Sequence, residues 1–318
     1  MTVNVGLIGA RGYVGREMLE LIARHPEFSL AYASSREWDG KPIADMLDGD
    51  THFDGQVFEA LGPEAAADRK ADVVILGLPN GKAAPFVEAV GNTASDSVLI
   101  DLSADYRHDD TWTYGLPERN RAEIEGASRI ANPGCYATAA QLTLLPLKGL
   151  LDGQAHIFGL SGWSGAGTTP SRKNDPEALH DNVIPYGLVG HGHEREIAVH
   201  SGEDVRFMPC VASFFRGLIV TVSAQLTETA DENQIAELFA ETYRDEPFAM
   251  LLDEPAEPVA AAGTHLCQIG RPQLRADGRG VVVTSALDNL LKGAASQAIQ
   301  NLNLALGFDE KTGLILAR

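Results

Sequence analysis

Short apolar runs alternate with helical stretches over the first 138 residues. Residues 3–9 form an apolar run that leads into a glycine-containing turn, and Leu19, Ile22 and Ala23 then recur at helical spacing. Later apolar runs predict further strands at residues 28–33, 71–81, 97–107 and 129–131. Strands separated by helices are typical of a parallel, doubly wound sheet, so this region predicts an α/β domain of the Rossmann type.

Longer strands with few helices dominate the next part of the chain. Alternating apolar residues predict strands at residues 155–165, 205–214, 216–226, 264–271 and 279–290. Residues 231–246 form one amphipathic helix between them, and a second long helix is expected over residues 289–307. This pattern favours an α+β domain with a mainly antiparallel sheet. We therefore expect a nucleotide-binding domain formed by residues 1–138 and 288–318, and a catalytic and subunit-contact domain formed by residues 139–287.

Composition and charge narrow the possible partners. The chain has 318 residues and a formal charge of −19, which argues against nucleic acid because phosphate binding needs surplus Lys and Arg. No apolar run approaches the roughly 20 residues that span a bilayer, and the N-terminus lacks the pattern of a signal peptide. The three cysteines do not form a disulfide framework. We expect a cytoplasmic protein that acts on a small molecule, with no membrane partner.

The first turn carries a dinucleotide-binding pattern. A strand, a glycine turn and a helix follow one another, which lets the backbone approach a pyrophosphate at the helix N-terminus. The residues of this turn are Gly9, Ala10, Arg11, Gly12, Tyr13, Val14 and Gly15. The spacing is G-x-x-G-x-x-G rather than G-x-G-x-x-G, so the strand–helix context carries the prediction.

The ends of two later strands indicate which cofactor binds. Ser34, Ser35 and Arg36 stand where an NAD-selective domain has an acidic residue, and hydroxyls with an Arg suit a 2′-phosphate instead. We therefore predict NADP(H). Leu78 and Pro79 end the strand at residues 71–81, where the cofactor crosses the sheet, and we include them in its site.

Cys135 is the candidate nucleophile. It follows Asn132, Pro133 and Gly134, which are turn formers, and it opens an apolar helix. A thiol at a helix N-terminus gains from the dipole and from nearby N–H groups, so its thiolate is favoured. Cys210 and Cys267 lie in strand-like stretches and are expected to be core residues.

Two further clusters offer polar chemistry. The turn at residues 161–167 exposes hydroxyls and N–H groups suited to phosphate or nicotinamide, and we assign Gly165 and Ala166 to the cofactor. His191 and His193 lie among acidic residues, and a pair of imidazoles can move protons near neutral pH. No third ligand has recognisable spacing, so no metal is expected. Four other histidines are interpreted as surface residues: His25, His52, His108 and His200.

Eight segments together resemble the N-acetyl-gamma-glutamyl-phosphate reductase family, within the aspartate-semialdehyde dehydrogenase superfamily. They occur in family order over nearly the whole chain: GARGYVG (9–15), DLSADYR (101–107), YGLPE (114–118), ANPGCYAT (131–138), SGWSGAG (161–167), GHGHEREI (190–197), GTHLCQIG (263–270) and ALDNLLKGAASQAIQNLNLALGF (286–308). The resemblance implies reduction of an acyl phosphate by NADPH in arginine biosynthesis. It also implies a homo-oligomer, a dimer or a tetramer.

The resemblance also assigns roles. It implies that Cys135 forms a thioester, that His191 is the acid/base, and that His193 and Glu196 support them. Asn289, in the last segment, is assigned to the cofactor. The residues assigned to the substrate are Arg107, Asn132, Ser161, Ser164 and Arg216.

The chain departs from the family pattern near the substrate. Gly192 stands where the family usually has Arg, Arg195 stands where it has Pro, and Thr168 follows the SGAG turn in place of Arg. The acyl group is therefore open between N-acetyl-glutamyl, aspartyl and carrier-linked aminoadipyl phosphate. A Cys–His acyltransferase, with a purely structural glycine turn, and a non-catalytic NADP sensor are the alternatives from other classes.

Overall fold

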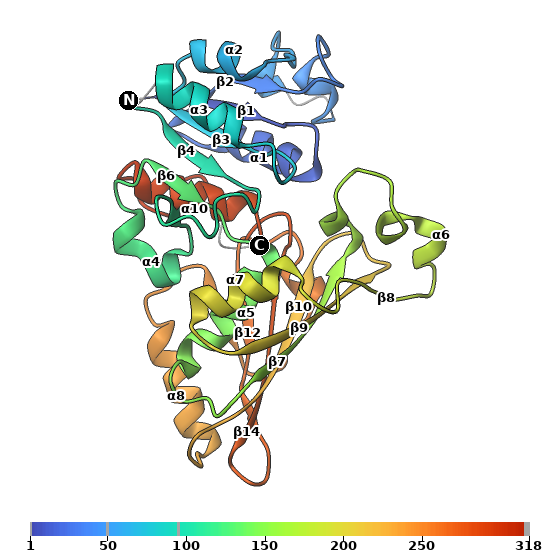
Figure 1. Cartoon of the computed structure of the whole chain (residues 1–318), viewed down its shortest axis with the longest axis vertical. Helices are drawn as coiled ribbons and strands as arrows, with labels where there is room; N and C mark the ends of the chain where they lie inside the picture. The colour runs from blue at the N-terminus through green and yellow to red at the C-terminus, as the bar shows by residue number, and fades with distance from the viewer. Residues whose placement is uncertain (1, 49–50, 94–95, 315–318) are drawn as a thin grey trace. The chain divides into compact units, whose positions relative to one another are not determined.

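The computed structural model describes residues 2–48, 51–93 and 96–314 (Figure 1). Two compact units make up the chain. The first contains Met1–Pro133 and Ala294–Leu314, and the second contains Gly134–Gly293. The sequence placed these two changes of unit at residues 138 and 288, a few residues away from where the structure has them. Each unit is described by itself below.

The first unit is built on a parallel sheet of six strands in the order β2-β1-β3-β4-β6-β5. All five pairings between neighbouring strands are parallel, which confirms the expected Rossmann-type sheet. The strands are β1 (Val3–Ile8), β2 (Phe28–Ser34), β3 (Val73–Leu76), β4 (Val98–Asp101), β5 (Thr113–Tyr114) and β6 (Arg129–Ala131). Every residue of β3 is buried, as expected for a central strand covered on both faces.

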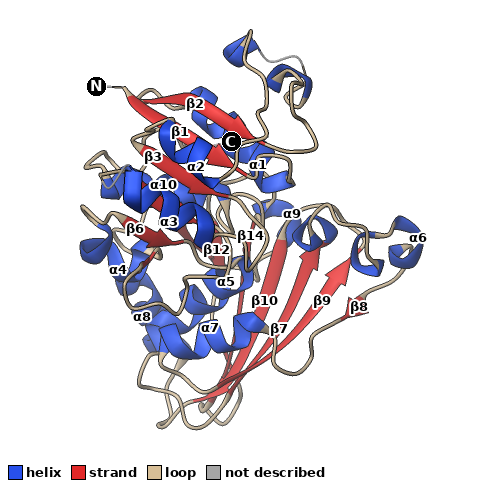
Figure 2. Ribbon diagram, turned by 45° about the horizontal axis from the view of Figure 1, so that its top comes forward, coloured by secondary structure: helices blue, strands red, loops and turns tan. Residues whose placement is uncertain are grey.

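Helices connect and cover these strands (Figure 2). They are α1 (Tyr13–Arg24), α2 (Pro63–Asp68), α3 (Ala84–Thr93), α4 (Pro117–Ile124) and α10 (Ala295–Ala305). α10 packs against α1, α4 and β4, so the C-terminal segment completes the first unit. Polar side chains of α10 are buried and hydrogen-bonded: Gln297 Nε2 and Asn301 Nδ2 both donate to the carbonyl oxygen of Gly115 at 2.8 Å. This satisfies groups that would otherwise be costly to bury.

The final helix begins later than the sequence indicated. The helical pattern was expected from residue 289, but α10 starts at Ala295, and residues 289–294 form turns. Asp288 explains part of the difference, because its carboxylate accepts hydrogen bonds from the backbone N–H groups of Leu290 and Leu291. A side chain that binds nearby backbone N–H groups offers the chain an alternative to helix.

His25 was expected on the surface, and this expectation is wrong. The side chain is 4% exposed, and its ring stacks on Phe28 with centroids 3.7 Å apart. Nδ1 accepts from the N–H of Glu27 at 3.2 Å, and Nε2 lies 2.9 Å from Asn303 Oδ1. Both contacts suit the neutral ring, and burial lowers the pKa of His25. His52 and His108 are exposed and His200 is half-buried.

We expect His25 to make the first unit less stable in mild acid. Between the lowered pKa of the folded state and the ordinary value of about 6.5, the unfolded chain binds a proton that the folded chain does not. Stability is therefore lost as the pH falls below about 6.5. Urea unfolding at pH 7.5 and 5.5 checks this, with His25→Gln as the non-titrating control. An equal loss of stability in both proteins would contradict it.

The second unit contains a mixed, mostly antiparallel sheet of eight strands, as predicted for its class. Seven strands follow the order β11-β12-β14-β10-β7-β9-β8, and β13 pairs with β14 outside this path. Only β7–β9 and β11–β12 are parallel among the pairings in the described residues. The strands are β7 (Ala155–Gly162), β8 (Ile184–Pro185), β9 (Val205–Ala212), β10 (Leu218–Gln225), β11 (Ala249–Leu252), β12 (Cys267–Gly270), β13 (Gln273–Leu274) and β14 (Gly280–Leu287).

Helix α5 packs on the centre of this sheet, against β10 and β14, and α7 packs on α5 (Figure 2). The helices of the unit are α5 (Cys135–Leu144), α6 (Pro176–Leu179), α7 (Gly192–Ser201), α8 (Glu232–Thr242) and α9 (Pro258–Ala261). α8 begins with a capping box, in which Asp231 and Gln234 each accept a hydrogen bond from the other's backbone N–H. Among the described residues, no helix is both long and apolar enough to cross a membrane.

Candidate active site

Cys135 is the first residue of α5. Gly134 is the N-cap, no side chain caps this helix end, and no acidic residue lies in its first turn. The backbone N–H groups and the positive end of the helix dipole therefore act on the thiol without a competing carboxylate in that turn. Cys135 is half-buried, whereas Cys210 and Cys267 are buried. Burial raises the pKa of Cys210, which keeps that thiol protonated.

Gly293 lies directly against Cys135. A Cβ atom at Gly293 would come within 2.6 Å of Cys135 Cβ and within 2.8 Å of the backbone of Asn289. Two carbon atoms cannot approach so closely without displacing the backbone. This glycine therefore allows the turn after β14 to pass beside the start of α5.

Glu196 joins α7 to the N-terminus of α5. Its side chain is 2% exposed, and its Oε1 accepts from the backbone N–H of Gly134 at 2.8 Å. The carboxylate thus satisfies a helix N-terminal donor and fixes the residue that precedes the nucleophile. The structure brings the start of α5 and Glu196 together, although 62 residues of sequence separate Gly134 from Glu196.

His191 is the N-cap residue of α7. Its Nδ1 accepts from the N–H of His193 at 3.2 Å, which orients the ring and leaves Nε2 as the nitrogen that can exchange a proton. Burial lowers the pKa of His191, and the charge of Lys173 lowers it further, while Glu196 and Glu194 act in the opposite direction. The ring is therefore a neutral base at physiological pH.

Two tyrosines connect His191 with Cys135, and sequence reasoning missed both. Tyr136 donates from its hydroxyl to the carbonyl oxygen of Cys210 at 2.8 Å, and a side-chain hydrogen bond links it to Tyr186. The Tyr186 ring lies 5.5 Å from the His191 ring. Burial raises the pKa of Tyr186, and the charge of a Cys135 thiolate raises it further. Tyr136 near a helix start and Tyr186 after a strand both look like ordinary core residues, so nothing in their sequence context signals this role.

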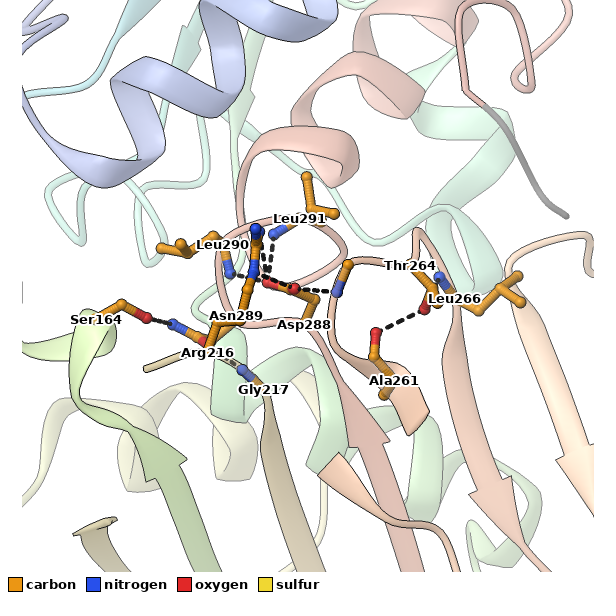
Figure 3. A network of polar contacts seen from close by, with 11 residues as sticks. Ser164, Arg216, Gly217, Ala261, Thr264, Leu266, Asp288, Asn289, Leu290 and Leu291 are labelled. Carbon is orange, nitrogen blue, oxygen red and sulfur yellow. Dashed lines mark hydrogen bonds and ion pairs between the residues drawn. The ribbon is translucent and has the colours of Figure 1, made fainter. Parts of the chain in front are cut away.

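Arg216 is held by a buried carboxylate (Figure 3). Its Nε donates to Asp288 Oδ2 at 2.6 Å and its Nη2 to Oδ1 at 3.3 Å. Asp288 is fully buried and also accepts from the N–H groups of Gly263, Leu290 and Leu291, at 2.5, 2.9 and 3.3 Å. These bonds fix the position of the Arg216 guanidinium.

Asn289 ties the glycine-rich turn to the strand start that follows Arg216 (Figure 3). Its Oδ1 accepts from the N–H of Gly217 and its Nδ2 donates to Ser164 Oγ, both at 2.8 Å. Within the turn, a Cβ atom at Gly165 would lie 3.1 Å from Ser161 Oγ. Residues assigned to the substrate (Ser161, Ser164) and to the cofactor (Gly165, Ala166, Asn289) therefore meet in one place.

The predicted dinucleotide turn lies in the first unit and fits its role. Gly9 has φ +83°, and a Cβ atom there would come within 2.2 Å of the Gly77 carbonyl oxygen. A Cβ atom at Gly15 would meet the Ala10 carbonyl oxygen at 2.3 Å, whereas Gly12 faces open space. α1, which begins at Tyr13 and Val14, has no side-chain cap and no acid in its first turn, so its N-terminus suits a phosphate.

The other predicted cofactor residues of this unit lie at strand ends. Ser34 and Ser35 are buried, and their hydroxyls accept from the N–H groups of Leu61 and Trp38 at 3.3 Å. Arg36 is exposed. Arg11 forms an ion pair with Glu37, an acidic residue that directly follows Arg36 and was not among the predicted residues. Leu78 and Pro79 follow β3, half-buried and exposed respectively. Their roles stay predictions.

Arg107 and Asn132, predicted to bind substrate, contact each other in the first unit. Arg107 Nε donates to the carbonyl oxygen of Asn132 at 2.9 Å. The Asn132 side chain accepts from Asn301 Nδ2 and donates to the carbonyl oxygen of Ala294, both at 3.1 Å. Among the described residues, no group of three or more His, Cys, Asp or Glu side chains is placed to hold a metal ion.

Comparison with known proteins identifies the family. Residues 4–127 match the model for the semialdehyde dehydrogenase NAD binding domain, and residues 135–289 match that for the semialdehyde dehydrogenase dimerisation domain. The N-acetyl-gamma-glutamyl-phosphate reductase of Xanthomonas campestris pv. campestris (strain B100) is 50% identical over 318 residues, covering 99% of this chain and 100% of the relative. The chain belongs to the N-acetyl-gamma-glutamyl-phosphate reductase family. It is therefore an oxidoreductase with a nicotinamide dinucleotide-binding first unit, as predicted.

Other members of the N-acetyl-gamma-glutamyl-phosphate reductase family match over similar lengths. The protein of that name from Stenotrophomonas maltophilia (strain R551-3) is 50% identical, with 98% of each chain covered, and the one from Xylella fastidiosa (strain M23) is 47% identical, with 98% of this chain and 95% of the relative covered. Among solved structures, aspartate semialdehyde dehydrogenase II from Vibrio cholerae aligns with a TM-score of 0.77 at 19% identity, covering 96% and 99%. Aspartate semialdehyde dehydrogenase from Candida albicans, solved with NADP, gives 0.71 at 17%, covering 96% and 99%. These structures share the fold.

Proposed function

We propose that this protein reduces N-acetyl-gamma-glutamyl phosphate to N-acetyl-glutamate 5-semialdehyde, through a thioester on Cys135 and with NADPH as reductant. Relatives of this name at 50% identity over nearly the full chain support the activity. The observation that carries the mechanism is the thiol of Cys135 at the uncapped start of α5, beside Glu196 and close to Tyr186 and His191. The enzyme would act in the cytoplasm, in the biosynthesis of the amino acid arginine.

Cys135 opens the reaction. Its thiolate adds to the acyl carbon, the bond from that carbon to the phosphate oxygen breaks, and inorganic phosphate leaves. Backbone N–H groups in the first turn of α5 donate to the oxygen that becomes negative as the thiolate adds. Glu196 holds this turn in place through Gly134. The covalent intermediate divides one difficult reduction into two easier steps.

His191 transfers the proton during the second half of the reaction, the reduction of the thioester. When bound, NADPH supplies the hydride that converts the thioester to a thiohemiacetal. His191 takes the thiol proton of Cys135 before the attack, delivers it to the oxygen that the hydride transfer leaves negative, and takes it back as the C–S bond breaks. This releases the aldehyde and restores the Cys135 thiolate. The lowered pKa of His191 suits this second role, because the ring must be neutral to accept the proton.

We propose NADPH rather than NADH as the reductant because of the residues at the end of β2. Ser34, Ser35 and Arg36 place hydroxyls and a cation where a ribose 2′-OH would otherwise need an acid. The open space at Gly12 and the uncapped start of α1 fit the pyrophosphate. We propose that Arg216 and the hydroxyls of Ser161 and Ser164 bind the acyl substrate in the second unit. Asp288 supplies the rigidity that such a cation needs.

Features of the second unit lead us to propose that the protein forms a homo-oligomer. Residues 135–289 match a domain family described as a dimerisation domain. Large apolar side chains stay exposed on its sheet: Phe158 of β7 at 45%, and Met250 and Leu251 of β11 at 40% and 39%. A second copy of the chain would cover them. Sedimentation velocity of the purified protein tests this assembly.

The reaction run backwards tests the proposed function. We expect NADP+ to be reduced at alkaline pH by N-acetyl-glutamate 5-semialdehyde, and the rate to vanish without inorganic phosphate, because phosphate must attack the thioester. NAD+ in place of NADP+ should support a lower rate at equal concentration. Turnover of aspartate semialdehyde alone would keep the chemistry and reject the acyl group. No phosphate-dependent turnover of either aldehyde would reject the reductase.

A further inference from the structure

Lys173 stands at the end of the loop that leaves the glycine-rich turn. It lies in a short 3₁₀ helix, Arg172–Asn174, whose N-cap is Ser171. Asn174 fixes this loop: its Oδ1 accepts from the N–H of Ser171 at 2.7 Å, and its Nδ2 donates to the carbonyl oxygens of Gly167 and Thr169 at 2.8 Å. The backbone that carries Lys173 is therefore tied to the turn at residues 161–167.

The ammonium group of Lys173 lies beside the residues proposed for catalysis. Its Nζ is 4.7 Å from the centroid of the Tyr186 ring, in a cation–π contact. Tyr186 in turn lies 5.5 Å from the His191 ring and packs against a core of Leu179, Ile184 and Val211. The aromatic ring thus positions a cation next to the acid/base.

No carboxylate in the described residues neutralises this cation. Lys173 is half-buried and takes part in none of the ion pairs among them, although the chain has 44 acidic and 25 basic residues. The two acids whose charges act on His191 also accept backbone hydrogen bonds: Glu194 from the N–H of Phe207 and Glu196 from that of Gly134, both at 2.8 Å. A half-buried charge without a counter-ion, next to a histidine whose protonation it opposes, is costly unless a ligand compensates for it.

We propose that Lys173 and Tyr186 form a subsite for an oxyanion of the substrate, either the phosphate or a carboxylate. A lysine ammonium is a compact charge that binds either group. This inference rests on the proposed function, because it concerns the same site. An anion bound there would cancel the field of Lys173 at His191, which also faces Tyr186, His193, Glu194 and Glu196. Binding of the anion would therefore favour the protonated ring.

Steady-state kinetics in the backward direction test the subsite. We expect Lys173→Met to raise the KM for one anion by roughly 10- to 100-fold, the range for loss of a charge-assisted hydrogen bond. A rise in the KM for inorganic phosphate identifies the phosphate, and a rise in the KM for the semialdehyde identifies its carboxylate. Lys173→Arg should recover part of the loss. Arg172→Met, which removes the adjacent exposed cation, is the matched control and should stay within about twofold. Unchanged KM values in Lys173→Met would overturn the proposal.

NMR titration of labelled His191, assigned with His191→Asn, gives a readout that needs no turnover. The probes are inorganic phosphate and N-acetyl-glutamate at constant ionic strength. In the wild-type protein one of them should raise the pKa of His191, and in Lys173→Met this response should disappear. A response in the wild type without reductase activity would keep the subsite and reject the function. Activity with the same response in both proteins would keep the function and reject the subsite.

Discussion

Cys135→Ala is expected to abolish turnover, with a loss of roughly 10⁴-fold or more, because the covalent intermediate has no other thiol at the start of α5. NADPH binding should not change, since the glycine turn that we assign to it lies in the first unit. Initial rates of the phosphate-dependent reaction and a fluorescence titration with NADPH measure the two effects.

A second cysteine gives the matched control for this result. Cys267 is fully buried in β12, and Cys267→Ala removes a thiol of the same chemistry while every residue of α5 stays unchanged. We expect that variant to keep activity within a few-fold, after a modest loss of stability. Retained turnover in Cys135→Ala would reject the thioester. Loss of NADPH binding in it would show that the substitution disturbs more than the nucleophile.

Asp288→Ala is expected to cost about 3 to 5 kcal/mol of folding stability. The substitution leaves the N–H groups of Gly263, Leu290 and Leu291 without their acceptor and removes the partner of Arg216. Deleting one member of a buried ion pair costs about this much. The Arg216 side chain is 27% exposed, so water recovers part of its loss. Urea unfolding of the second unit, followed by circular dichroism, measures the change.

The reciprocal variant separates the two contributions. Arg216→Met should destabilise the protein less than Asp288→Ala, because the Asp288 carboxylate keeps its three backbone donors. It should nevertheless weaken substrate binding if Arg216 is a substrate ligand. Equal destabilisation by the two substitutions would show that the ion pair, rather than the backbone hydrogen bonds, holds this segment.

Local patterns were enough to predict the two sheets and the start of the helix that Cys135 opens. The alternation of apolar runs and helices predicted the parallel sheet, because a buried strand such as β3 needs a continuous apolar run. The longer alternating strands predicted the mixed sheet. Cys135 could be proposed from Asn132, Pro133 and Gly134 before it, because turn formers followed by an apolar run define a helix start.

Contacts between residues far apart in the sequence escaped these patterns. His25 was expected on the surface but lies in the core. The sequence pattern missed this because its hydrogen-bond partner, Asn303, is 278 residues away along the chain. The late start of the final helix, which begins after residues 289–294, depends on Asp288. Its carboxylate accepts from the backbone there and also binds Arg216, 72 residues away. Tyr186 and Lys173 could be proposed for the site only once the structure showed Tyr186 beside His191 and Lys173 on the Tyr186 ring.

The sequence by itself determined the class of fold, the glycine-containing turn before α1 and the place of Cys135 at the start of a helix, since each depends on residues within one or two turns of chain. The tertiary structure alone decided what surrounds Cys135 and Arg216: Glu196 on Gly134, Gly293 against Cys135, and Asp288 bound to Arg216. The physical reason is that hydrogen bonds, packing and charge act over a few ångströms in space. Separation along the chain does not limit them, so only the folded arrangement reveals which groups they join.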